Sequence, residues 1–400
     1  MFKKATKLQK FALWVIFIII LTSTGCNYRM QPKGDIEVLQ EKWMQQVATN
    51  TNGWFDNSGT WLLKRDYKHE HPLVCQKTIL PDTDFTDLII AGNANIQIIA
   101  GAPRNAITIY GDNGSANQVS LSYLKSQLTV NTAGDASNTT VRIEAKRLTS
   151  ILNMNQNTVI GKINQESKIN IISTSHANTF LDGEINLCFL ENSGYGTVTI
   201  TGIQSNNLNL TVPDDGNVRL AGRIGIQNIE HDGDGDVSIV GADSDKLSIT
   251  TYGSGVTSVY GHVNLKQINA DEKSYVLVYW ADTNDLKVTQ KKDTFVGIAG
   301  ASLKLQADVQ GSSCFQGQYL RTGNAFIKTY NTARANVTAG NKIFASAAGS
   351  SVILYYGEPQ DISKTTARNA SILALNDVPE SLIVSPYLKS GPWPVKIQPL

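Results

Sequence analysis

The chain has 400 residues, and its 35 basic residues nearly balance its 34 acidic ones, giving a formal net charge of +1. This balance, with no basic block and no stretch where aromatic and basic residues alternate, argues against nucleic acid as a partner. Glycine is abundant and only 11 residues are proline, a composition typical of a turn-rich β protein rather than a disordered chain.

The amino terminus has the features of an export signal. Four lysines precede an apolar core, FALWVIFIIIL, that is too short to span a bilayer comfortably. Small residues follow in the run LTSTGC, which resembles a bacterial lipobox with Ser23 in place of the usual leucine. The sequence therefore predicts a signal peptide over residues 1–25 and a lipid on Cys26, with an uncleaved anchor or ordinary secretion as alternatives. Asn27, by resemblance to Gram-negative sorting, favours an outer-membrane lipoprotein that faces the periplasm or the surface.

Residues 26–80 are predicted to form a tether and an irregular segment. The run KHEHPLVC in this segment holds metal-capable side chains, but it has no fourth ligand and no regular element to hold them. We therefore expect a solvated loop there and no metal. Besides Cys26, the odd set Cys75, Cys188 and Cys314 excludes a fully paired framework. Buried thiols and one disulfide involving Cys75 both remain open.

A repeat of about twenty residues dominates the middle of the chain. Each copy has a glycine turn, a short strand of alternating residues and a closing glycine; the clearest closing glycines are Gly202, Gly222, Gly241 and Gly261. A fixed period in this range indicates one supersecondary unit stacked on its neighbours. The glycines six residues before the closers are expected to form corners with positive φ; they are Gly196, Gly216, Gly235 and Gly255.

Two apolar columns precede the closing glycines. The position two before the closer holds Ile200, Leu220, Ile239, Val259 and Tyr279. The position four before holds Val198, Val218, Val237, Thr257 and Leu277. Because side chains alternate across a strand, both columns face one side, and the polar column between them, which includes Ser238, faces the other. We expect the two apolar columns to form buried ladders.

These observations predict an all-β fold, a right-handed parallel β-helix with coils of about 20 residues and two or three short strands per coil. An antiparallel sandwich with regular hairpins is the alternative. The β-helix domain is expected over residues 81–375, and residues 376–400 form a proline-bearing carboxyl-terminal tail that docks on the last coil or hangs free.

Three stretches resemble the head GIN domain of auto-transporter adhesins. They are FTDLIIAGNANIQIIAGAPRNAITIYGD (85–112), the interior repeat YGSGVTSVYG (252–261), and the ending Tyr355, Gly357 and Pro359. The resemblance covers about 85–375. This chain has more coils than a usual member, Ala281 stands in place of a closing glycine, and the early turns are rich in Asn rather than Ser. It implies a parallel β-helix on bacterial envelopes, often lipid-anchored or secreted, without established catalytic residues.

The sequence holds two weak indications of chemistry. HDGDGD (231–236) spaces three aspartates as in a calcium loop, but Val237 stands where that loop requires glycine. We expect a polar turn there, and no metal or cofactor. The polar column between the two apolar columns reads Thr, Arg, Ser, Ser on successive coils. It lacks the paired carboxylates of polysaccharide hydrolases. A non-enzyme is therefore predicted, with a carbohydrate-active β-helix enzyme as the alternative.

One aromatic pair is a candidate binding site. Tyr260 and Trp280 stand one position before the closing residue on successive coils, so we expect an outward-facing strip that contacts a glycan or an envelope protein. Packing against the tail or a neighbouring loop is the alternative. The predicted function is thus a lipid-anchored envelope protein with a non-catalytic binding, adhesive or structural role, in contact with a membrane through its lipid.

Overall fold

The computed structural model describes residues 75–81, 84–134 and 136–375. The predicted signal peptide, Cys26, the tether as far as residue 74 and the tail from 376 lie outside these residues. Within the described ranges we find no helix whose length and hydropathy would let it cross a bilayer. The chain divides into two compact units, and the boundary between them passes through two neighbouring coils.

Of the residues that the structure describes, 73% are in strands and 1% in a helix, and they form a β-solenoid with coils of about 19 residues. The predicted β-helix fold and repeat length are confirmed. The strands of the amino-terminal unit are β1 (Cys75–Ile79), β2 (Asp87–Gly92), β3 (Asn95–Ala100), β4 (Ala106–Gly111), β5 (Val119–Leu124), β6 (Gln127–Thr132), β7 (Thr140–Ala145), β8 (Ser150–Asn155), β9 (Val159–Ser173), β10 (Thr179–Asn192) and β11 (Val198–Val212).

The amino-terminal unit begins with strands that pair in both directions. β1 and β7 each lie antiparallel to β4, and β5 lies antiparallel to β6. The short helix α3 (Asn113–Ala116) follows β4, and the side chain of Asp112 accepts a hydrogen bond from the Ser115 amide, 2.7 Å away, at its start. Regular parallel stacking begins with β2, β3, β8 and β9. The antiparallel start was not predicted, because a short alternating strand can pair in either direction.

The carboxyl-terminal unit continues the same coil pattern. Its strands are the second half of β12 (Val218–His231), most of β13 (Val237–Thr251), β14 (Val256–Ala270), β15 (Tyr275–Gln290), β16 (Phe295–Val309), β17 (Cys314–Thr329), β18 (Arg334–Gly349), β19 (Val352–Tyr356), β20 (Asp361–Arg368) and β21 (Ser371–Leu375). From β14 onward every pair of neighbouring strands in this unit is parallel.

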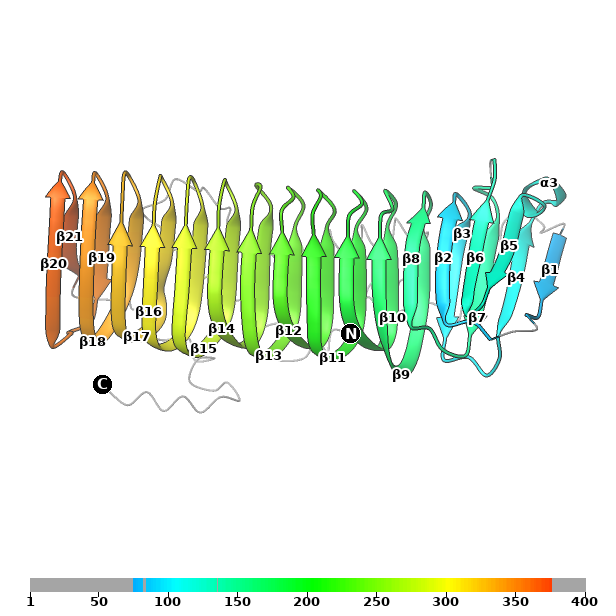
Figure 1. Cartoon of the computed structure of the whole chain (residues 1–400), viewed down its shortest axis with the longest axis horizontal. Helices are drawn as coiled ribbons and strands as arrows, with labels where there is room; N and C mark the ends of the chain where they lie inside the picture. The colour runs from blue at the N-terminus through cyan, green and yellow to red at the C-terminus, as the bar shows by residue number, and fades with distance from the viewer. Residues whose placement is uncertain (1–74, 82–83, 135, 376–400) are drawn as a thin grey trace, which may run out of the picture. The chain divides into compact units, whose positions relative to one another are not determined.

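Each long strand bends once, so one coil contributes a leg to each of two sheets (Figure 1). In β14 the first leg, Val256–Tyr260, pairs with Tyr275–Tyr279 of β15, and the second leg, Gln267–Ala270, pairs with Lys287–Gln290. The pairing register shifts between the two legs, which is where the strand bends. A coil therefore has two legs joined by a bend and closed by a turn.

The predicted inward ladder is present. Ile200, Leu220, Ile239 and Val259 are each at most 2% exposed, while Ser238 on the opposite side of its strand is only half-buried. The interior of each unit is therefore filled by its own apolar residues.

The ladder shifts by one residue at β15, and the sequence assignment of two positions is wrong. Val259 pairs with Val278, and Tyr260 pairs with Tyr279. Compared with β16, β15 has one additional residue before Ala281: Tyr279 lies beside Ala299 and Ala281 beside Gly300, Trp280 has no counterpart in β16, and the peptide bond before it is cis. Leu277 and Tyr279, predicted to face inward, therefore face outward.

The glycines also act differently from the prediction. Positive φ occurs at the closing glycines, for example +72° at Gly202, and not at the glycines six residues earlier. Gly196 instead allows close contact between turns, because a Cβ atom there would lie 2.0 Å from the carbonyl oxygen of Ala177. Glycine is thus needed at both positions, for conformation at one and for space at the other.

Polar side chains line the inner side of the turns. The hydroxyls of Thr251 and Ser274 lie 3.0 Å apart, and the side chain of Gln290 donates to the hydroxyl of Thr294 at 3.0 Å. These residues are at most 2% exposed. Their hydrogen bonds satisfy polar groups that the closing of each coil removes from water.

Candidate functional site

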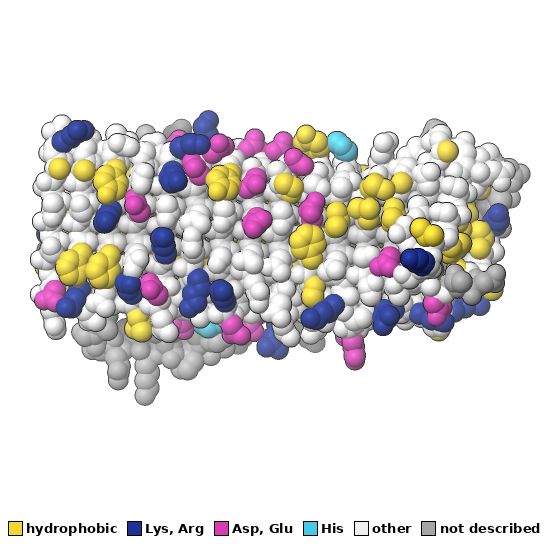
Figure 2. Space-filling model, in the orientation of Figure 1, with side chains coloured by type: hydrophobic (Ala, Val, Ile, Leu, Met, Phe, Trp, Pro, Cys, Tyr) yellow, Lys and Arg dark blue, Asp and Glu magenta, His cyan; other side chains and the backbone are white. Residues whose placement is uncertain are grey.

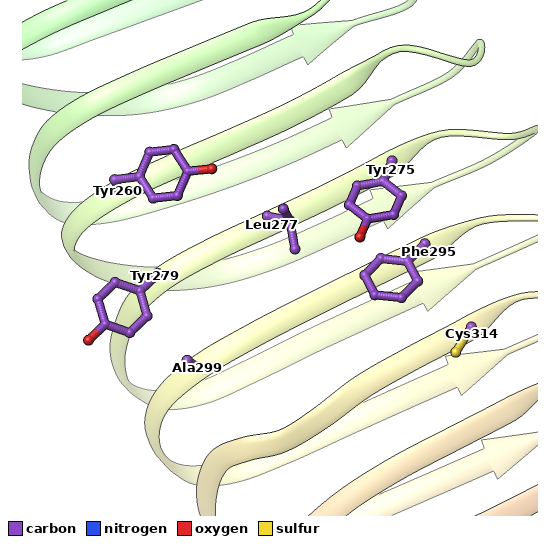
Figure 3. Close-up of a cluster of buried hydrophobic side chains, with 7 residues drawn as sticks. All are labelled: Tyr260, Tyr275, Leu277, Tyr279, Phe295, Ala299 and Cys314. Carbon is purple, nitrogen blue, oxygen red and sulfur yellow. The ribbon is translucent and has the colours of Figure 1, made fainter. Parts of the chain in front are cut away.

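The carboxyl-terminal unit carries a cluster of apolar side chains on the outer side of its first legs, which we call the aromatic face. It consists of Tyr260, Tyr275, Leu277, Tyr279, Phe295, Ala299 and Cys314 (Figure 3). These residues alternate along their strands with inward residues such as Val278 and Ile298, which are fully buried. The aromatic face therefore points away from the coil interior.

Its rings are closely packed. The rings of Tyr275 and Phe295 stack with centroids 4.2 Å apart and an interplanar angle of 5°. The ring of Trp280 meets that of Tyr279 edge to face at 5.7 Å. Aromatic pairs of this kind contribute about 0.5–1.5 kcal/mol beyond the area they bury. The aromatic face is therefore a packed cluster rather than a set of isolated exposed rings.

Both residues of the predicted binding pair lie at this face, but not as expected. Tyr260 lies beside Tyr279 and is 8% exposed, whereas Trp280 packs against the rim of the cluster and is half-buried. The prediction of one shared outward column is therefore wrong, because the register places Tyr260 beside Tyr279 rather than beside Trp280. Burial raises the pKa of Tyr260 to about 12, so its phenol is neutral at physiological pH. Ligand binding by the pair stays a prediction.

A polar border closes one side of the aromatic face. Gln316 lies beside Cys314 in the outer row of β17, and its side-chain oxygen accepts a hydrogen bond of 2.9 Å from Asn336. The hydroxyl of Tyr356 lies 3.5 Å from the side-chain oxygen of Gln318. Gln316 and Gln318 are at most 5% exposed. The cluster thus ends against amide groups that are hydrogen-bonded.

A second aromatic pair lies on the outer side of the other sheet, and sequence reasoning missed it. The rings of Phe326 and Phe344 stack with centroids 5.0 Å apart, and Phe344 is 42% exposed. The ammonium group of Lys304 lies 5.8 Å from the centroid of Phe326. At this separation the two rings cover each other's faces. A search of the second legs for aromatic residues one coil apart would have found the pair.

Charges on this sheet alternate in sign between neighbouring coils. Lys304 pairs with Asp285 at 3.5 Å, and Lys342 pairs with Asp361 at 2.6 Å. On the face shown in Figure 2, basic side chains are scattered, with acidic side chains between some of them, and several acidic side chains lie close together at the upper edge. Exposed pairs of this kind stabilise a fold only slightly. They place opposite charges together, unlike the two carboxyl groups of a glycosidase.

The aspartate-rich turn of the predicted calcium alternative has a structural role. The side chain of Asp215 accepts a hydrogen bond from the Asp234 amide at 3.0 Å, and Asn217 does the same for Asp236 at 2.9 Å. Each turn thus accepts hydrogen bonds from the turn of the next coil. Among the residues that the structure describes, no group of three or more His, Cys, Asp or Glu side chains is arranged to hold a metal ion.

The fold is a β-solenoid whose coil interiors are filled by apolar side chains. Its aromatic and charged side chains lie on the outer sides of the sheets. The sequence matches the family "Putative auto-transporter adhesin, head GIN domain" over residues 84–267 and 261–359. The chain belongs to this family. Two successive matches agree with the expectation of more coils than in a usual member.

Several crystal structures match this chain, each with a low TM-score. A putative adhesin from Bacteroides fragilis NCTC 9343 is 13% identical over 76% of this chain and 99% of its own, with a TM-score of 0.24. A putative lipid binding protein from Parabacteroides distasonis ATCC 8503 is 14% identical over 75% and 97%, with a TM-score of 0.25. A putative adhesin from Parabacteroides merdae ATCC 43184 is 12% identical over 76% and 96%, with a TM-score of 0.23. No curated protein matches the sequence.

Proposed function

We propose that this protein is a non-catalytic binding protein of the bacterial cell envelope, held on the outer membrane by a lipid on Cys26. Membership of the adhesin head-domain family carries this proposal and favours an envelope or surface location. The filled coil interior supports it, because contacts with a partner then come from a lateral face. The partner class that we propose is an envelope glycan or protein.

The sequence alternative, a polysaccharide-degrading enzyme, requires carboxylates or basic residues gathered in one groove. The charges on the second legs of β15 to β20 instead form pairs of opposite sign between coils. This pattern favours a surface for binding. Co-sedimentation of unlipidated protein with isolated envelopes tests the binding directly.

Lipid anchoring predicts a specific result for one variant. Cys26→Ser removes the thiol that receives the lipid, so the protein should move from the membrane fraction to the soluble fraction. Mass spectrometry of the wild-type protein should find Cys26 as the first residue, with added acyl mass. Cys188→Ser is the matched control, because Cys188 is a free thiol and its loss should leave the membrane fraction unchanged. Membrane retention of Cys26→Ser, or an intact signal peptide, would contradict the anchoring.

A further inference from the structure

The stacked rings of Phe326 and Phe344 differ in how far each is open to solvent. Their planes are within 2° of parallel and their centroids lie 5.0 Å apart, so each ring covers one face of the other. The far face of Phe326 points toward Gln306, its neighbour in β16, and the ammonium group of Lys304 lies 5.8 Å from the ring centroid. The far face of Phe344 points toward Ser363, its neighbour in β20. Because serine is small, this face stays open, and Phe344 is 42% exposed.

Polar side chains stand on both sides of this open face. Outward residues recur at every second position of a strand, about 6.6 Å apart, so the outward rows two positions before and two positions after Phe344 flank its ring. The row before the ring holds Lys342 and Asp361, which are exposed and whose charged groups lie 2.6 Å apart. The row after the ring holds Ser346 and Thr365. The open aromatic face thus lies between an ion pair and two hydroxyl groups.

The charges around the two rings cancel. In the row before the rings, Lys304 and Lys342 each pair with an aspartate of a neighbouring coil. In the row after the rings, Asp308 of β16 lies in register with Lys328 of β17. A strongly charged partner would therefore gain little attraction at this surface. The arrangement favours a partner that is neutral and rich in hydrogen-bonding groups.

A sugar ring has the chemistry that fits this surface. One face of a pyranose ring carries C–H bonds, which pack on an aromatic face, and its rim carries hydroxyl groups that donate and accept hydrogen bonds. Lysine only donates, ionised aspartate only accepts, and serine and threonine do both, so hydroxyl groups on either edge of a ring stacked on Phe344 would find partners. The core of a protein interface is instead depleted of charged residues, which here stand in the rows next to the rings.

We propose that the open face of Phe344 stacks on a neutral sugar ring of an envelope glycan, and that Lys342 and Asp361 form hydrogen bonds with the hydroxyl groups of that ring. This inference rests on the proposed function, because it names a site and a ligand class for the same envelope binding. It places that binding on the sheet of the second legs and not at Tyr260 and Trp280.

Sedimentation of soluble Cys26→Ser protein with envelopes isolated from the producing bacterium tests the site. In this background Phe344→Ala should weaken binding about three- to tenfold, the loss expected for one aromatic stacking contact, and Phe344→Trp should retain it. Lys342→Ala, at an exposed position, should also weaken binding. Tyr330→Ala is the matched control, because Tyr330 is a 37% exposed aromatic residue directly after β17, and its loss should leave binding unchanged.

Treatment of the envelopes identifies the ligand class. Periodate, which cleaves sugar carbons that carry adjacent hydroxyl groups, should abolish the binding that depends on Phe344, and protease digestion should leave it. Loss of that binding on protease digestion would show a protein partner and overturn the assignment of a sugar. Binding that Phe344→Ala leaves unchanged would overturn this site while the proposed function stands. No envelope binding by the Cys26→Ser protein itself would overturn both.

Discussion

Tyr260→Ala should destabilise the protein by about 3–5 kcal/mol, the range for removing a large buried aromatic side chain. Tyr260 is 8% exposed and packs within the aromatic face beside Tyr279, so its loss leaves a cavity among rings. Trp280→Ala should cost clearly less, because Trp280 is half-buried at the rim of the cluster. Chemical denaturation of the two single variants measures both values.

Tyr260→Phe is the matched control, because it keeps the ring and should retain most of the stability. Equal, small losses for Tyr260→Ala and Trp280→Ala would contradict the burial of Tyr260 and would favour an outward-facing strip formed by the pair. Of the two single variants, only Trp280→Ala is suited to test glycan or protein capture, since a binding loss in Tyr260→Ala would be confounded by unfolding.

Leu220→Ala should destabilise the protein by about 2–5 kcal/mol, because Leu220 is 2% exposed within the inward ladder. Ser238→Ala, on the outward side of the neighbouring coil, should change stability by less than about 0.5 kcal/mol. Thermal unfolding of both variants, followed by circular dichroism at a β-sheet wavelength, gives the melting temperatures to compare. Similar shifts for both variants would contradict the assignment of inward and outward columns.

The repeat and its inward columns could be predicted because apolar residues and glycines recur at a constant spacing. Ile200, Leu220, Ile239 and Val259 follow from this spacing alone, and all are buried. The spacing fails at Trp280, which is one residue more than β16 has before its closing residue. The alternating pattern of the sequence looks normal there. The additional residue becomes evident only when Ala281 is placed in register with the next coil. Only the pairing between coils shows the shift.

Two other features could not be predicted, for different reasons. Polar residues such as Thr251 and Gln290 suggest contact with solvent, yet the closing of each coil turns them inward, where their hydrogen bonds are made. The burial of outward residues such as Phe295 depends on what covers a sheet, and the repeat pattern describes only how coils stack on each other. The aromatic face was therefore only partly visible in the sequence, through Tyr260 and Trp280.

The central claim is that this protein binds an envelope component without altering it. The most direct measurement is co-sedimentation of Cys26→Ser protein, which lacks the lipid, with envelopes isolated from the producing bacterium, together with analysis of the supernatant for released saccharides. We expect saturable sedimentation of the protein and no released fragments above the level without protein. Absence of saturable binding, or steady release of soluble saccharide in proportion to protein added, would contradict the claim.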